Sequence, residues 1–174
     1  VLIYVDNDAA LKANAVTVGD GASHAGIDLY GNHVIVRSDD GSATTTTDLA
    51  AAKGAFADAD ILYSVAGSAL TVSGATTELY IGAGQQFSAG GNVTTADLES
   101  RGTYDGGSGT LRINRDLVVA GGTFTASSGT TQVARNLTVS GGSFAHNGGT
   151  FSFDTGIDAT IDGGSAVFNN VVVA

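Results

Sequence analysis

The chain lacks cysteine, proline, methionine and tryptophan altogether. Without cysteine there is neither a disulfide nor a thiolate metal site, so packing alone must stabilise the fold. The absence of proline beside 26 glycines argues against collagen and against a proline-rich linker. A hydrophobic content of 43% argues against disorder. The sequence therefore predicts a folded protein that is stabilised without covalent cross-links.

Positive charge is also scarce, because 7 basic residues face 17 acidic ones and the net charge is −10. Such a surface repels nucleic acid and anionic membranes, so we expect neither as a partner. No run approaches the roughly 20 apolar residues of a membrane helix, so we expect no membrane insertion. The sequence starts at Val1 and has no basic segment followed by an apolar core, so we expect a signal peptide to be either removed or absent. We therefore expect a processed product or a segment of a longer chain.

The clearest pattern is a tandem repeat of twenty residues. Residues 115–134 (RDLVVAGGTFTASSGTTQVA) align without a gap with residues 135–154 (RNLTVSGGSFAHNGGTFSFD). A fixed period, with alternating apolar residues and glycines between the runs, is typical of stacked β-coils. We therefore predict an all-β fold, a parallel β-helix or β-solenoid with three-strand coils of about 20 residues.

The alternation of apolar and polar residues assigns the two faces of each coil. We expect strands at 117–119, 123–125 and 130–133. The predicted inward residues and their stacked equivalents are Leu117, Val119, Phe124, Thr131 and Val133, with Leu137, Val139, Phe144, Phe151 and Phe153. We interpret residues 91–114 as the preceding coil, lengthened to 24 residues by an insertion near 96–100.

The chain as a whole is predicted to be one β-solenoid domain, residues 1–174. Within it, residues 1–60 are irregular and residues 61–174 form regular coils. The β pattern breaks at 42–60, which is rich in alanine. There Thr47 or Asp48 is suited to cap a short helix running to about Phe56. Leu49, Ala52 and Phe56 would share one face of that helix, and a long loop is the alternative.

The repeats resemble the β-helical repeat regions of large bacterial secreted and surface adhesin-like proteins. The segments that carry the resemblance are DLVVAGGTFTASSGTTQV, NLTVSGGSFAHNGGTFSF and IDGGSAVFNNVVV. It covers residues 61–174 but hardly the first 60. The resemblance implies a β-solenoid in an extracellular or cell-surface location. It transfers no catalytic residue.

Residues suited to catalysis or metal binding are dispersed. His24, His33 and His146 have no metal-ligand spacing, and no nucleophile elbow is present. Asp39–Asp40, or Asp58 with Asp60, are the carboxylates that a polysaccharide-degrading β-helix would use, although acidic turns are common for geometric reasons. We therefore assign no catalytic, cofactor-binding or metal-binding residue and expect a protein that is not an enzyme.

Calcium is the one cofactor for which the sequence has any pattern. Asp6-Asn7-Asp8 begins like a Ca²⁺ loop, but the glycine and the terminal glutamate of that motif are missing. We expect no cofactor.

The ends of a β-solenoid are its critical surfaces, because one coil cannot bury its own face. The apolar runs at the two chain ends are candidate subunit contacts, unless they simply close the core of the rod. The contact candidates are Val1, Leu2 and Ile3 at one end and Val171, Val172 and Val173 at the other. Asn92 and Asn136 match the glycosylation acceptor pattern, and our alignment places them two coils apart on the same edge.

The leading hypothesis is a non-enzymatic extracellular structural protein. It would serve as a filament subunit, an adhesin stalk or a cell-surface or matrix component, associating end to end with itself. Glycans and the cell envelope are further candidate partners. The alternative is a carbohydrate-binding or polysaccharide-degrading β-helix, which needs a groove with convergent carboxylates or exposed aromatic residues. Five tyrosines and no tryptophan favour the structural hypothesis.

Overall fold

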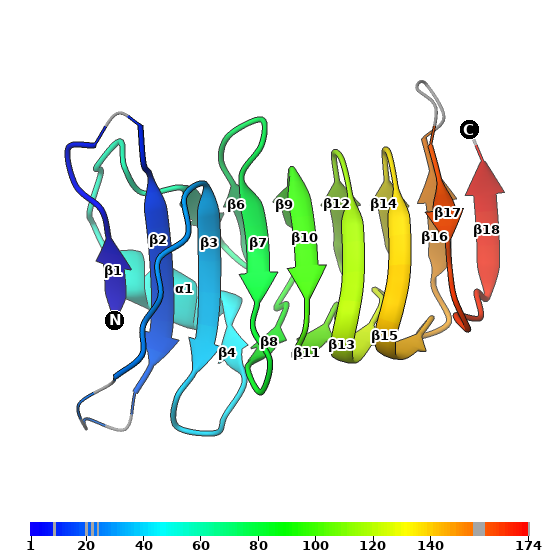
Figure 1. The fold of residues 1–174 in the computed structure, drawn as a ribbon, viewed down its shortest axis with the longest axis horizontal. Coiled ribbons are helices and arrows are strands. Elements are labelled where there is room, and N and C mark those ends of the chain that lie inside the picture. Colours follow the sequence, from blue (N-terminus) through cyan, green and yellow to red (C-terminus); the bar gives the residue numbers. More distant parts are fainter. Residues whose placement is uncertain (9, 20, 22, 24, 155–158, 174) are drawn as a thin grey trace.

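Two sheets of strands face each other along a rod, as Figure 1 shows for a computed structural model. The structure describes residues 1–8, 10–19, 21, 23, 25–154 and 159–173. Most neighbouring strands are parallel and come from successive coils, and side chains from both sheets fill the space between them. The predicted all-β solenoid is confirmed.

We call the 11-stranded sheet the front sheet and the 7-stranded sheet the back sheet. The front sheet contains β1 (Leu2–Tyr4), β2 (Ala13–Val18), β3 (His33–Ser38), β4 (Thr44–Thr45), β7 (Glu78–Ile81), β8 (Gln86–Ser88), β10 (Asp97–Ser100), β11 (Thr103–Asp105), β13 (Leu117–Thr125), β15 (Leu137–Ala145) and β17 (Ile161–Asp162). The back sheet contains β5 (Tyr63–Ala66), β6 (Ala69–Val72), β9 (Val93–Thr95), β12 (Thr110–Ile113), β14 (Thr130–Val133), β16 (Thr150–Phe153) and β18 (Asn170–Val173).

The tandem repeat forms the most regular part of the rod. β13 spans the first two strands predicted for its coil as one bent strand, and β14 is the third. All five side chains predicted to point inward from this coil are buried. The bend needs glycine, because Gly122 has a φ of +60° and a Cβ there would collide with the Gly102 carbonyl oxygen.

The strand register corrects the predicted insertion near 96–100. These residues include β10, whose Leu98 pairs with Leu117 of β13 at a spacing of 19 residues. The spacing in the back sheet at this level, from Val93 to Leu111, is 18 residues. A longer step comes at the C-terminal side, since Leu137 stacks on Ile161 at a spacing of 24. The coil at 91–114 is therefore not lengthened.

Aromatic side chains form a column inside the regular coils. The ring centroids are 5.9 Å apart from Phe87 to Tyr104, 4.9 Å from Tyr104 to Phe124 and 5.6 Å from Phe124 to Phe144. Adjacent members lie on paired strands one coil apart. The column therefore follows from repeating an aromatic residue at one inward position of each coil.

The N-terminal part differs because β2 is covered on both faces. Its inward residues Asn14 and Val16 are buried, but so are its outward residues Ala13, Ala15 and Thr17. Residues 25–32, which lie between β2 and β3 in the sequence, return across the outside of the front sheet, as Figure 1 shows. We call this segment the strap. Arg37 of β3 holds the strap by donating from Nη1 to the Gly26 carbonyl oxygen at 2.7 Å.

The helix predicted within 42–60 is confirmed as α1 (Thr46–Lys53). Its cap is Thr45, not Thr47 or Asp48, and Asp48 completes a capping box with Thr45. Leu49 is buried, whereas Phe56 lies beyond the helix and is 61% exposed, so the expected shared face was wrong. The helix ends early because Gly54 has a φ of +52°. No helix within the described ranges has the length and apolar character needed to cross a membrane.

Candidate functional site

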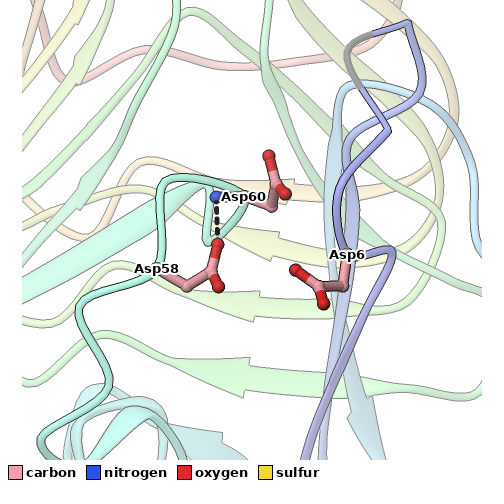
Figure 2. Close-up of side chains that lie close together, drawn as sticks. All are labelled: Asp6, Asp58 and Asp60. Carbon is pink, nitrogen blue, oxygen red and sulfur yellow. Dashed lines mark hydrogen bonds between the residues drawn. The ribbon is translucent and has the colours of Figure 1, made fainter.

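Three aspartates come together near the N-terminal end of the rod, as Figure 2 shows. Carboxylate oxygens of Asp6, Asp58 and Asp60 lie within 4.8 Å of one another. Lys12 Nζ lies 2.9 Å from Asp60 Oδ1, and the Asn7 amide donates to Asp60 Oδ2 at 2.8 Å. Those contacts, the lysine first, lower the pKa of Asp60. Lys12 pairs with one of the three carboxylates, Asp60, and this pair together with the Asn7 bond fastens the β1–β2 connection to the segment after α1.

Residues 39 and 40, the other carboxylate pair expected from the sequence, point to different partners. Asp39 binds the Arg37 guanidinium through both carboxylate oxygens, at 3.0 and 2.7 Å. Asp40 accepts from the amide and hydroxyl of Ser42, which lower its pKa. These contacts stabilise the β3–β4 turn. The structure does not bring Asp39–Asp40 together with Asp58 and Asp60 into one site.

Among the histidines, His33 has the most contacts, His146 caps a turn, and His24 lies outside the described residues. His33 Nδ1 donates to the Gly31 carbonyl oxygen at 2.6 Å, which leaves Nε2 facing Glu78 Oε1 at 3.4 Å. That oxygen is buried and has no hydrogen bond, and burial raises the pKa of Glu78. A proton on either group would make this contact favourable. The pair joins the end of the strap to β7.

A pocket of about 210 Å³ lies beside this pair, between the strap, the front sheet and the turn after β7. Tyr30 from the strap packs edge to face against Tyr80 of β7, with ring centroids 5.8 Å apart. Both rings also meet His33, at 5.8 and 6.1 Å. Asp28 and Gln85 supply polar groups to the same lining. Exposed aromatic and polar side chains therefore converge at one place on the rod.

The residues matching the glycosylation pattern lie on different sheets, which corrects their expected common edge. Asn92 precedes β9 of the back sheet and is exposed, while Asn136 precedes β15 of the front sheet. Asn92 Oδ1 accepts from the Thr110 amide at 2.8 Å. Asn136 Nδ2, the atom that a glycan would modify, donates to Asp116 Oδ1 at 2.8 Å. Both asparagines tie one coil to the next.

Asn136 belongs to a ladder at one corner of the rod. Asp97 Oδ1 accepts from the Asp116 amide at 3.0 Å, and Asp116 Oδ1 accepts from the Asn136 amide at 3.1 Å. Asn136 Oδ1 then accepts from the Thr160 amide at 2.9 Å. Arg115 and Arg135 lie beside the first two carboxylates. Each coil therefore satisfies a backbone donor of its successor.

The candidate contact residues at the C-terminus lie on the open end of the rod. Val171 and Val173 of β18 pair in register with the buried residues Phe151 and Phe153, so they occupy inward positions. Their exposed fractions are nevertheless 47% and 64%, because no coil among the described residues lies over them. Val172, which points outward, is 42% exposed. Phe168 covers part of this end by packing against Phe144, Phe151 and Phe153.

The candidates at the N-terminus lie at the opposite end (Figure 1). β1 pairs antiparallel with β2, matching Leu2 with Val16 and Ile3 with Ala15. The Val1 amino group donates to the Thr17 carbonyl oxygen at 2.7 Å, and Leu2 packs against the core. Together with Leu49 of α1, which is fully buried, this strand closes the N-terminal end.

The pocket is the feature that sequence reasoning missed. Tyr30 and Tyr80 are fifty residues apart and share no motif, and they meet because the strap crosses the front sheet. Tyr30 and Tyr80 come together because β3 pairs with β7. This pairing aligns His33 with Glu78 and Ile35 with Tyr80. The usable signal was the pair of small outward residues Ala13 and Ala15 in β2, which lets another segment pack closely on the outer face.

Comparisons with known proteins found no matching family model, no similar curated protein and no similar solved structure.

Proposed function

We propose that the protein is a non-enzymatic structural rod of the cell surface or extracellular matrix, such as an adhesin stalk, that forms a dimer through its C-terminal coil rather than a filament. The observation that carries this proposal is the exposure of inward positions in the last coil. Val171, Val173 and Ile161 stack on buried residues but are 47%, 64% and 48% exposed. They form a cross-section of the hydrophobic core.

Strand addition would cover this surface. β18 is an edge strand of the back sheet, so its outer edge carries unpaired backbone groups. β18 has the sequence Asn-Val-Val-Val, without the lysine, proline or charge that commonly protects an edge. An added strand would pair those groups and bury the valines, which favours association by both hydrogen bonding and the hydrophobic effect.

The closed N-terminal end makes a C-terminal to C-terminal contact the better arrangement. β1 and α1 already cover the core there. Two C-terminal ends related by a two-fold axis would pair β18 antiparallel with its copy, and an uncharged strand meets no repulsion from itself. The extracellular location rests on the resemblance of the repeats, and the lack of cysteine is compatible with it because the stacked core needs no disulfide.

The degrading form of the alternative hypothesis lacks support in the pocket. Hydrolysis of a glycosidic bond uses two carboxyl groups, one on each side of the bond. The residues lining the pocket include a single carboxylate, Asp28. The carboxylates of Glu78, Asp97 and Asp116 are engaged in contacts within the rod.

Sedimentation velocity over a range of protein concentrations tests the association. The wild type should form a dimer, and negatively stained particles should be rods of twice the length of the monomer. Val173→Asp should abolish the dimer, because each copy would then bury an unpaired charge in an apolar contact. The matched control is Val1→Asp, at a position 66% exposed at the other end of the rod. A wild type that stays monomeric, or a dimer lost equally in both variants, would contradict the proposal.

A further inference from the structure

The pocket beneath the strap has the size and composition of a site for a small polar ligand. Its volume of about 210 Å³ lies below the range of pockets for drug-sized molecules and suits one ring rather than a nucleotide. Tyr30, Tyr80 and Ile35 give it apolar surface, and Asp28, Gln85 and Arg37 give it polar groups. A few polar groups within an apolar lining are what fixes the orientation of a small ligand.

The charges of the lining argue against an anionic ligand. The arginine is occupied, because Arg37 Nε and Nη2 donate to Asp39 and Nη1 donates to the Gly26 carbonyl oxygen. Asp28 adds a negative charge, and among the described residues it accepts one hydrogen bond, a long contact of 3.5 Å from the Tyr30 hydroxyl. An anion would therefore meet a carboxylate, and the charge of the arginine is already paired with Asp39.

The remaining polar groups match hydroxyl groups, which both donate and accept. Asp28 offers carboxylate oxygens as acceptors. Gln85 Oε1 already accepts from the Ser38 amide at 2.6 Å, so the Nε2 group of Gln85 is left to donate. A ligand with neighbouring hydroxyl groups satisfies both side chains at once.

The two tyrosines supply the apolar half of such a site. Their rings meet at an interplanar angle of 78°, an edge-to-face contact that occupies one ring face and leaves others for a ligand. Tyr30 is 45% exposed although it packs against two other rings. The C–H face of a pyranose ring packs well on an aromatic face, while its equatorial hydroxyl groups point to the rim.

From these features we propose that the pocket between the strap and β7 binds a neutral sugar residue of a glycan, with Tyr30 and Tyr80 contacting the ring and Asp28 and Gln85 bonding its hydroxyl groups. The site is independent of the C-terminal coil. Loss of self-association would leave sugar binding unchanged, and the two proposals succeed or fail separately.

Saturation-transfer NMR and titration with methyl glycosides test the proposal on the whole protein. The probes are the methyl glycosides of glucose, galactose, mannose, N-acetylglucosamine and glucuronic acid. At least one neutral glycoside should bind with a dissociation constant of about 1 mM, a value typical of so small a ligand. The glucuronide should bind at least tenfold more weakly than that glycoside.

Variants locate the binding. Tyr30→Ala and Asp28→Ala should each weaken it at least fivefold, while Phe56→Ala, which removes an aromatic side chain 61% exposed outside the pocket, should leave it unchanged. Equal melting temperatures of Asp28→Ala and wild type would show that the loss is not unfolding. The proposal is overturned if no neutral glycoside binds, if the glucuronide binds as tightly, or if both pocket variants bind like the wild type.

Discussion

Equivalent inward positions are buried at one end of the rod and exposed at the other. At the N-terminal end Val16 and Leu49 are fully buried, because β1 pairs antiparallel with β2 and α1 covers the adjoining core. At the C-terminal end Val171 and Val173 occupy inward positions and are about half exposed or more, at 47% and 64%. Within the described residues, the cap at the N-terminal end comes from β1 and α1, which lie outside the repeat. A cap needs non-repeating sequence, and here that sequence is at 1–62.

The largest expected effect on stability comes from truncating a buried apolar side chain at the N-terminal end, compared with an exposed one at the C-terminal end. Leu49→Ala should lower the free energy of unfolding by about 3 kcal/mol, because it opens a cavity under the helix that closes the core. Val173→Ala should lower it by about 0.5 kcal/mol, because that side chain already meets water. Chemical denaturation of the monomer measures both values. Equal losses would mean that the C-terminal end is as well packed as the N-terminal end.

A pair of asparagines extends the comparison to hydrogen bonds. Asn14 is fully buried, donates to the Asp60 carbonyl oxygen at 2.9 Å and accepts from the Leu62 amide at 2.6 Å. Asn14→Ala leaves both backbone groups unpaired and should cost about 2 kcal/mol. Asn170 makes one exposed bond to Thr150 Oγ1, so Asn170→Ala should change stability by less than about 0.5 kcal/mol. Denaturation midpoints that shift equally would contradict this ranking.

Two buried tyrosines should respond to the same substitution with opposite signs. Tyr63 at the closed end donates its hydroxyl to the Leu49 carbonyl oxygen at 3.0 Å, so Tyr63→Phe should cost about 1 kcal/mol. The Tyr104 hydroxyl in the aromatic column is buried and has no partner among the described residues, so Tyr104→Phe should stabilise the protein by about 1 kcal/mol. Thermal unfolding distinguishes the two, and a loss in both variants would show that the Tyr104 hydroxyl is bonded.

The smallest effect expected is pH dependent and concerns Glu78 under the strap. Burial raises the pKa of this carboxyl above its ordinary value, while His33 opposes the rise. Its charged form therefore opposes folding above the raised pKa, and this cost vanishes below the ordinary pKa, where the group is protonated in both states. Glu78→Gln should raise the melting temperature by about 2 °C at pH 8 and by nothing near pH 4.

The matched control for this prediction is Asp162→Asn in the open coil. Asp162 is exposed and accepts one weak bond from the Gly164 amide at 3.4 Å. Its substitution should show no comparable gain at pH 8. A gain in Glu78→Gln that persists at pH 4 would indicate improved packing rather than removal of a charge.

The regular coils could be predicted because the repeat shows which residues occupy equivalent positions in successive coils. Leu117, Val119 and Phe124 recur twenty residues later, and period-two alternation turns that recurrence into inward and outward faces. Prediction failed at 96–100 because β10 has a single large apolar residue, Leu98, between polar ones. A strand so poorly marked resembles an insertion until its register is known.

The N-terminal third and the pocket depended on contacts that no local pattern encodes. Asn14 recognises the backbone of residues 60 and 62, and Tyr30 meets Tyr80 only after the strap has crossed the outside of the front sheet. The antiparallel pairs β1–β2 and β5–β6 also depart from the parallel order of the coils. Each of these features occurs once in the chain, so a search for periodicity cannot detect it.

The ladder of Asp97, Asp116 and Asn136 has a consequence for how such a rod changes length. Each of these side chains presents the same oxygen to the backbone amide of the following coil. A deletion of residues 115–134 would therefore bring Asp97 opposite the Asn136 amide, an acceptor and a donor that already suit each other. A duplication of those residues would insert another matched pair. One coil is thus a unit that can be deleted or duplicated as a whole. Rods of different length can arise in this way without changes at either end.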